Sequence, residues 1–162
     1  MNRSLSSASL AIRIGWLLLV ALAFGLPIAC AKPVRTLTTS DTIQPGELAK
    51  VLADSSAAHP MLIHVGFDPL YRSGHIPGSA YAGAGSKPGG LASLKDILKT
   101  VPASEPIVLY CGCCPWTDCP NVRPAFQTAL ASGHSNVHVL FIQKTLEHDW
   151  TEPGYPTAKG AD

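Results

Sequence analysis

The fold of this chain is decided by one stretch, which reads Ile107-Val108-Leu109-Tyr110-Cys111-Gly112-Cys113-Cys114-Pro115-Trp116-Thr117-Asp118-Cys119-Pro120-Asn121-Val122-Arg123. Its first four residues are apolar or aromatic and predict a buried strand over 107–110. The residues at 122–131 predict a helix, which Gly133 is placed to end. The loop between them holds four of the five cysteines. A thiol between a strand end and a helix N-terminus lies where N–H groups stabilise an anion, so we expect Cys111 to be a nucleophile with a lowered pKa.

The rest of the chain continues this alternation of strands and helices. Further strands are expected at 61–67 and 137–141, and further helices at 44–52 and 91–99. The segment 71–88 is rich in glycine and proline and is expected to be a long connection. This order predicts a single α/β domain with a mostly parallel central sheet flanked by helices. Ligands of such sheets bind beyond the carboxyl ends of the strands, where Cys111 lies.

The first 31 residues have the features of a targeting segment. Arg3 and Arg13 precede an apolar run over 14–24, and Ala29-Cys30-Ala31 then offers small residues for cleavage before Lys32. A signal peptide is therefore expected over 1–31. A lipoprotein signal that is modified at Cys30 and an uncleaved membrane anchor are the alternatives. We expect an exported protein, periplasmic or secreted, that is bound to a membrane only if the leader is retained or Cys30 is lipidated.

The remaining residues suffice for one domain with a hydrophobic core. We divide them into a polar lead-in at 32–42 and a domain at 43–160. Outside the leader, ten basic residues face eleven acidic ones. A nearly neutral chain without a basic stripe argues against a nucleic-acid partner. The sequence contains no cofactor-binding motif, and we expect no cofactor.

Four stretches, in this order, resemble the rhodanese-like domain family across nearly all of residues 41–160. They are the strand at 61–65, the Gly-His-Ile-Pro-Gly signature within 73–79, the strand and cysteine at 107–111, and a closing segment at 146–150 with Gly-Tyr-Pro at 154–156. The resemblance implies a sulfurtransferase whose cysteine takes a sulfane sulfur from a small donor anion and passes it to a thiol acceptor. It implies Cys111 as the catalytic residue, with Gly112, Cys113, Cys114 and Arg123 as substrate-binding residues.

The chain departs from the family's pattern at three places. His64-Val65-Gly66 stands where the family has Asp-Val-Arg, which puts a histidine near the expected sulfur. Gln143-Lys144-Thr145 replaces a glycine-rich signature. Twelve positions separate Cys111 from Arg123, whereas the family's loop is about half as long. The inserted residues include Trp116, which either walls a pocket or packs the longer loop.

The other cysteines of the loop, Cys113, Cys114 and Cys119, admit three interpretations. They can form a disulfide brace, as in many exported proteins. The C-x-x-C spacing of Cys111 and Cys114 is typical of an attacking thiol and a resolving thiol. Thiolates at Cys113, Cys114 and Cys119 can also bind Zn²⁺ or Cu⁺, although the sequence contains only half of a paired C-x₂-C pattern. The alternatives to sulfur transfer are thus a thiol–disulfide oxidoreductase using the Cys111/Cys114 pair, and a non-catalytic binding module with a disulfide- or metal-stiffened loop.

Overall fold

A five-stranded parallel sheet with the strand order β1-β5-β4-β2-β3 forms the centre of residues 35–161, the part of the chain that the computed structural model describes. The predicted signal peptide at 1–31 lies outside the described residues. The elements in chain order are η1 (Thr39–Asp41), β1 (Thr42–Ile43), α1 (Pro45–Ala53), β2 (Met61–His64), α2 (Asp68–Ser73), β3 (Ala80–Tyr81), α3 (Pro88–Leu98), β4 (Ile107–Tyr110), α4 (Val122–Ala131), β5 (Val137–Leu140) and the π-helix η2 (Glu147–Thr151).

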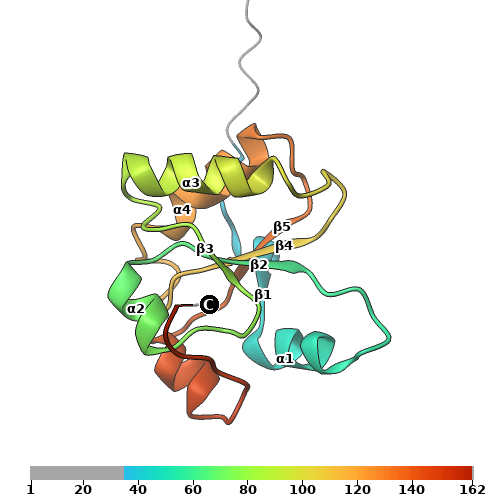
Figure 1. Cartoon of the computed structure of the whole chain (residues 1–162), viewed down its shortest axis with the longest axis vertical. Helices are drawn as coiled ribbons and strands as arrows, with labels where there is room; N and C mark the ends of the chain where they lie inside the picture. Colours follow the sequence, from blue (N-terminus) through green and yellow to red (C-terminus); the bar gives the residue numbers. More distant parts are fainter. Residues whose placement is uncertain (1–34, 162) are drawn as a thin grey trace, which may run out of the picture. The chain divides into compact units, whose positions relative to one another are not determined.

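Helices cover both faces of this sheet, with α3 and α4 on one face and α1 on the other (Figure 1). Side chains of β4 alternate between the two layers, as the period of a strand requires. Ile107 and Leu109 pack in the core that contains α3 and α4, whereas Val108 and Tyr110 pack in the core that contains α1. All four are at most 1% exposed. Cys111 follows Ile107 and Leu109 in this alternation, so its side chain lies on the side of the sheet that α4 covers.

The register of β2 on β4 places two loops side by side. His64 pairs with Tyr110 at the carboxyl ends of these strands. The N–H group of Val65 donates to the Tyr110 carbonyl at 2.8 Å and extends the pairing by one residue. The segment that follows β2 therefore lies beside Cys111.

The strongest sequence signals predicted the elements around the site correctly. Strand β4 and helix α4 have the predicted bounds, and the other predicted helices and strands differ by a few residues at their ends. The prediction of an unbroken connection at 71–88 was wrong, because the end of α2 and all of β3 lie in it. These two elements have six and two residues, which is too short for a periodic hydrophobic pattern.

The segment expected to be a lead-in takes part in the fold where it is described. Leu37 is only 4% exposed and belongs to the core with α3 and α4. Thr42 begins β1, which pairs in parallel with β5. Among the described residues, no helix combines the length and the hydropathy needed to cross a membrane.

Candidate active site

Cys111 follows β4 directly and is 2% exposed. The side-chain amide of Asn121 donates to the Cys111 sulfur at 3.2 Å. Asn121 is itself fully buried, and its Oδ1 accepts a hydrogen bond from the Ser86 N–H group at 3.0 Å. The cysteine sulfur is thus positioned by the residue at the N-cap position of α4, whose side chain makes this bond and no capping hydrogen bond. Sequence reasoning missed this role of Asn121, although asparagine before a predicted helix is a recognisable signal of a capping position.

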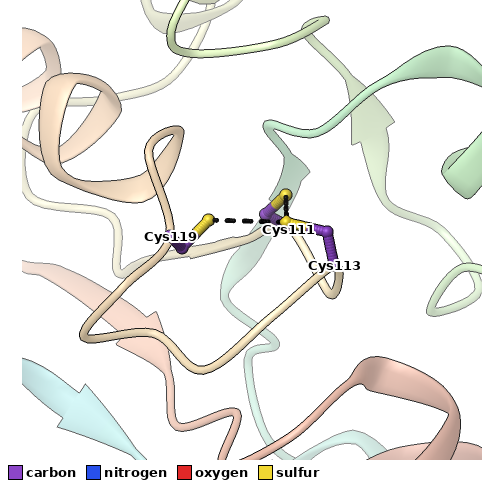
Figure 2. Close-up of side chains that lie close together, drawn as sticks. All are labelled: Cys111, Cys113 and Cys119. Atoms are coloured by element: carbon purple, nitrogen blue, oxygen red, sulfur yellow. Dashed lines mark hydrogen bonds between the residues drawn. The ribbon is translucent and has the colours of Figure 1, made fainter.

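Three sulfur atoms converge in the loop that follows β4 (Figure 2). Cys113 Sγ lies 3.4 Å from Cys111 Sγ and 4.0 Å from Cys119 Sγ, and all three sulfurs lie within 4.8 Å of one another. Cys114 Sγ is 3.0 Å from Cys113 Sγ but does not belong to this group. The contact of Cys111 is therefore with Cys113 rather than with Cys114. All four loop cysteines are thiols in the structure, and the disulfide brace stays a prediction.

The thiolate form of Cys119 is stabilised by its surroundings. The neighbouring Cys111 thiol, together with the N–H groups of Asn121 and Val122, lowers the pKa of Cys119 to about 5. The same interaction with Cys119, together with burial, raises the pKa of Cys111. Burial and the neighbouring thiols raise the pKa of Cys114 to about 12. A lowered pKa was expected at Cys111, but it is found at Cys119, which the Cys111 thiol and the N–H groups at the start of α4 stabilise as a thiolate.

The path of the long loop is fixed by contacts to the C-terminal part of the chain. Gly112 has φ +85°, and its carbonyl accepts a hydrogen bond from the Leu146 N–H group at 3.0 Å. The N–H group of Trp116 donates to the Ile142 carbonyl at 2.9 Å. The Trp116 side chain is 8% exposed and contacts the ring of Phe141. Trp116 therefore packs the longer loop against the segment that follows β5.

A cavity of about 310 Å³ opens beside the thiols. Its lining comes from the end of α2, the start of the cysteine loop and the closing segment: Leu70, Ser73, Gly74, Cys111, Gly112, Cys113, Thr145, Leu146, Glu147 and Thr151. Cys119 is not among these residues. Arg123 is exposed in the first turn of α4 and does not line the cavity either. The structure thus brings Gly112 and Cys113 together with Cys111 around a cavity and leaves Arg123 outside it.

His64 lies next to the Cys111 sulfur, as its place at the end of β2 predicted. A Cβ atom added to Gly66 would meet both His64 Cε1, at 2.7 Å, and Cys111 Sγ, at 2.8 Å. The imidazole is fully buried, and its Nδ1 accepts a hydrogen bond from the Gly66 N–H group at 3.2 Å. Its Nε2 has no hydrogen-bond partner among the described residues. Burial lowers the pKa of His64 to about 4.

We expect this histidine to make the fold sensitive to acid. The folded protein binds fewer protons than the unfolded chain between pH 6.5 and about 4, so the contribution of neutral His64 to stability is lost as the pH falls through this window. The loss is about 3 kcal/mol between pH 7 and pH 4. Urea unfolding of the wild type and of His64→Phe at both pH values measures it. The phenylalanine variant should show a smaller decrease, whereas a variant at the exposed His59 (His59→Gln) should behave like the wild type. Equal decreases in all three proteins would contradict the assignment.

No protein-family model matches the chain, and no curated protein matches it. Similar solved structures include the rhodanese-like domain of an Anabaena protein, with 20% identity over 75% of this chain and 87% of that chain and a TM-score of 0.53. A thiosulfate sulfurtransferase from Pseudomonas aeruginosa is 25% identical, with a TM-score of 0.56. The match covers 78% of this chain but only 20% of that protein.

A third similar structure is a variant of EanB that carries a cysteine persulfide, with ergothioneine, in a tetrahedral intermediate state. It is 19% identical over 75% of this chain and 33% of that chain, and its TM-score is 0.54. These similarities and the all-parallel sheet agree in one conclusion. The described residues therefore have the fold of rhodanese-like domains.

Proposed function

We propose that this domain is a sulfurtransferase that carries a sulfane sulfur as a persulfide on Cys111. The observation that carries the proposal is the placement of Cys111 at the end of β4, where its sulfur accepts a hydrogen bond from Asn121 and the residue lines a cavity. The pKa of Cys119 is lowered, but Cys119 does not line the cavity, so we assign the attack to Cys111. The similar structures named as a thiosulfate sulfurtransferase and as a cysteine persulfide support this chemistry.

The reaction takes two transfers. Cys111 loses its proton to solvent in the cavity, and its thiolate attacks the sulfane sulfur of the donor. The sulfur–sulfur bond of the donor breaks, and the remainder of the donor leaves with the electron pair. The Asn121 amide stabilises the sulfur charge on Cys111 in this step. An acceptor thiolate then attacks the outer sulfur of the persulfide and leaves with it, which returns Cys111 as a thiolate.

The residues that line the cavity indicate which sulfur donor it favours. Apart from the thiols, Glu147 is the one ionisable residue among its lining residues, and Ser73, Thr145 and Thr151 add hydroxyl groups. A carboxylate without a partner cation opposes the binding of a doubly charged anion. We therefore propose that an organic hydropersulfide, which carries at most one negative charge, is a better donor than thiosulfate.

The mass of the intact protein tests the proposal. The reduced protein is incubated with thiosulfate or with an alkyl hydropersulfide, and each sample is measured before and after treatment with a thiol reductant. We expect a gain of one sulfur atom, located on the Cys111 peptide, that the reductant removes. The alkyl hydropersulfide should load the protein at a lower concentration than thiosulfate. No adduct with either donor, in protein whose Cys111 is shown to be free, would exclude the proposed function.

The contact between Cys111 and Cys113 predicts how long the persulfide survives. The Cys113 thiolate can attack the inner sulfur, which forms a Cys111–Cys113 disulfide and releases hydrosulfide. The sulfur of Cys113 is 3.4 Å from that of Cys111, so we expect Cys113→Ser to prolong the persulfide lifetime by at least about tenfold. Cys114→Ser should leave the lifetime unchanged. Time-resolved mass spectrometry together with a hydrosulfide assay measures both variants, and a longer lifetime in Cys114→Ser alone would restore the C-x-x-C pair as the resolving pair.

The same contact favours thiol–disulfide exchange as a second candidate function. Two thiols at 3.4 Å need little movement to form a disulfide. An oxidoreductase would exchange electrons with a substrate disulfide without moving a sulfur atom. Reduction of a substrate disulfide with oxidation of the Cys111 and Cys113 thiols to a disulfide, and with no sulfur transfer from any donor, would favour this function.

We also propose that the domain acts outside the cytoplasm. Support comes from the sequence alone, namely the arginines, the apolar run and the small residues that precede Lys32. N-terminal sequencing of the protein from cell fractions tests it. A mature protein that begins at Lys32 in an extracytoplasmic fraction supports export, whereas a lipid on Cys30 or an intact leader in the membrane fraction would identify an anchored protein.

A further inference from the structure

The convergence of three sulfurs requires an explanation beyond sulfur transfer, which needs one nucleophile and at most one resolving thiol. The three side chains come from different parts of the loop: Cys111 from the end of β4, Cys113 from the turn after it, and Cys119 from the segment before α4. Figure 2 shows the sulfur of Cys113 between the other two, with both contacts drawn. A disulfide would use two of these sulfurs and leave the third unexplained.

The spacing of the sulfurs fits a single metal ion. A thiolate–metal bond is about 2.3 Å long, so three sulfurs in a plane around one ion lie about 4.0 Å apart. Two of the observed separations are 3.4 Å and 4.0 Å, and the third is within 4.8 Å. Small rotations of the side chains would bring all three to the separation that a bound ion requires. The sequence analysis grouped Cys113, Cys114 and Cys119 as metal ligands, and the structure places Cys111 in the group instead of Cys114.

The ligand atoms of the group indicate which metal ion it can bind. The group contains three sulfur atoms, and no carboxylate or imidazole of the described residues joins it within the same distance. Soft thiolates bind both Zn²⁺ and Cu⁺, but a structural zinc site is closed by four protein ligands and this group offers three. We propose that Cys111, Cys113 and Cys119 form a three-coordinate thiolate site for one Cu⁺ ion. Binding forms three copper–sulfur bonds, releases the protons of the coordinated thiols to solvent and changes no oxidation state.

The surroundings of the group are suited to this role. The Asn121 side-chain amide donates a hydrogen bond to Cys111 Sγ, and the Ser86 N–H group donates one to Asn121 Oδ1. Hydrogen bonds of this kind hold metal ligands in position. Cys111 and Cys113 line the cavity, so an ion can reach the sulfurs from the surface. The copper proposal depends on the arrangement of the sulfurs and not on the proposed function. Because both use Cys111, bound copper should exclude persulfide formation.

Competition with a coloured Cu⁺ chelator tests the proposal. The fully reduced protein, with its natural sequence, is titrated with Cu⁺ under anaerobic conditions. We expect one equivalent of copper to be retained, and X-ray absorption should show three sulfur neighbours at about 2.3 Å. Cys113→Ser should weaken binding by at least about 100-fold. Cys114→Ser is the matched control, in the same loop but outside the group, and should bind copper like the wild type.

Three results would overturn the copper site. They are failure to retain copper against the chelator, equal weakening by Cys113→Ser and Cys114→Ser, and displacement of the copper by an equivalent of Zn²⁺. Far-UV circular dichroism of each variant shows whether it is folded, and Cys119→Ser replaces Cys113→Ser if the latter is not. Persulfide formation is measured separately on metal-free protein. Its failure there would reject the sulfurtransferase without affecting the copper result.

Discussion

Replacing Cys111 by serine should lower the rate of sulfur transfer by at least about 10³-fold, because the serine oxygen cannot carry the sulfane sulfur as a persulfide. The residue is 2% exposed and accepts the Asn121 hydrogen bond, which a serine oxygen can also accept. The variant should therefore remain folded. The rate is measured with an alkyl hydropersulfide as donor and cyanide as acceptor, by the formation of thiocyanate.

Variants of two other thiols make this result specific. Cys114→Ser should transfer sulfur at close to the wild-type rate, since Cys114 lies outside the group of three sulfurs. Cys119→Ser should retain the persulfide site, because Cys119 does not line the cavity. Full activity of Cys111→Ser together with loss of activity in Cys119→Ser would instead place the persulfide on Cys119.

The position of Cys111 could be predicted from the sequence because its determinants are local. An apolar run at 107–110 and a helical pattern at 122–131 fix a strand and a helix, and a cysteine between them must lie at the carboxyl edge of the sheet. His64 could be placed near it for the same reason. Parallel strands that are buried end at the same edge, and the register of β2 on β4 then sets the neighbours.

The grouping of the other thiols could not be predicted because it depends on contacts that are distant in sequence. The loop is held by hydrogen bonds to Ile142 and Leu146, which follow β5. In the loop held this way, Cys119 lies within 4.8 Å of Cys111, whereas Cys114 contacts Cys113 but stays outside the group of three. The spacing of the cysteines alone suggested a pair of Cys111 and Cys114. One side of the cavity is likewise built from Thr145, Leu146 and Glu147, which no motif in the loop indicates.

The lowered pKa of Cys119 and the raised pKa of Cys111 also depend on the path of the loop. A strand end that faces a helix N-terminus attracts an anion, and this general expectation is met by the thiolate of Cys119. Two thiols compete for that place, and the longer loop puts Cys119 closer to the N–H groups of Asn121 and Val122. Cys111 is left with a raised pKa and access to the cavity. The inserted residues thus separate the thiol with the lowered pKa from the thiol that lines the cavity.

The turn at Gly112 leads to the second large prediction, that Gly112→Ala destabilises the protein by about 3 kcal/mol and lowers sulfur transfer about 100-fold. The backbone has φ +85°, which costs an alanine about 1 kcal/mol. A Cβ atom there would also lie 2.6 Å from the Leu146 Cβ, so the loop or the closing segment must move. A displacement of about 1 Å between Cys111 and the cavity accounts for the lost activity. Urea unfolding and the thiocyanate assay measure the two effects.

Gly154→Ala is the control that separates strain from contact. Gly154 has φ +88°, and a Cβ atom there would meet nothing within 4 Å. This variant should therefore lose only about 1 kcal/mol, the cost of the left-handed backbone, and keep its activity. The difference of about 2 kcal/mol between the variants then belongs to the contact between Gly112 and Leu146. If both variants lost the same stability and the same activity, the close approach of the cysteine loop to the closing segment would have no part in holding Cys111 at the cavity.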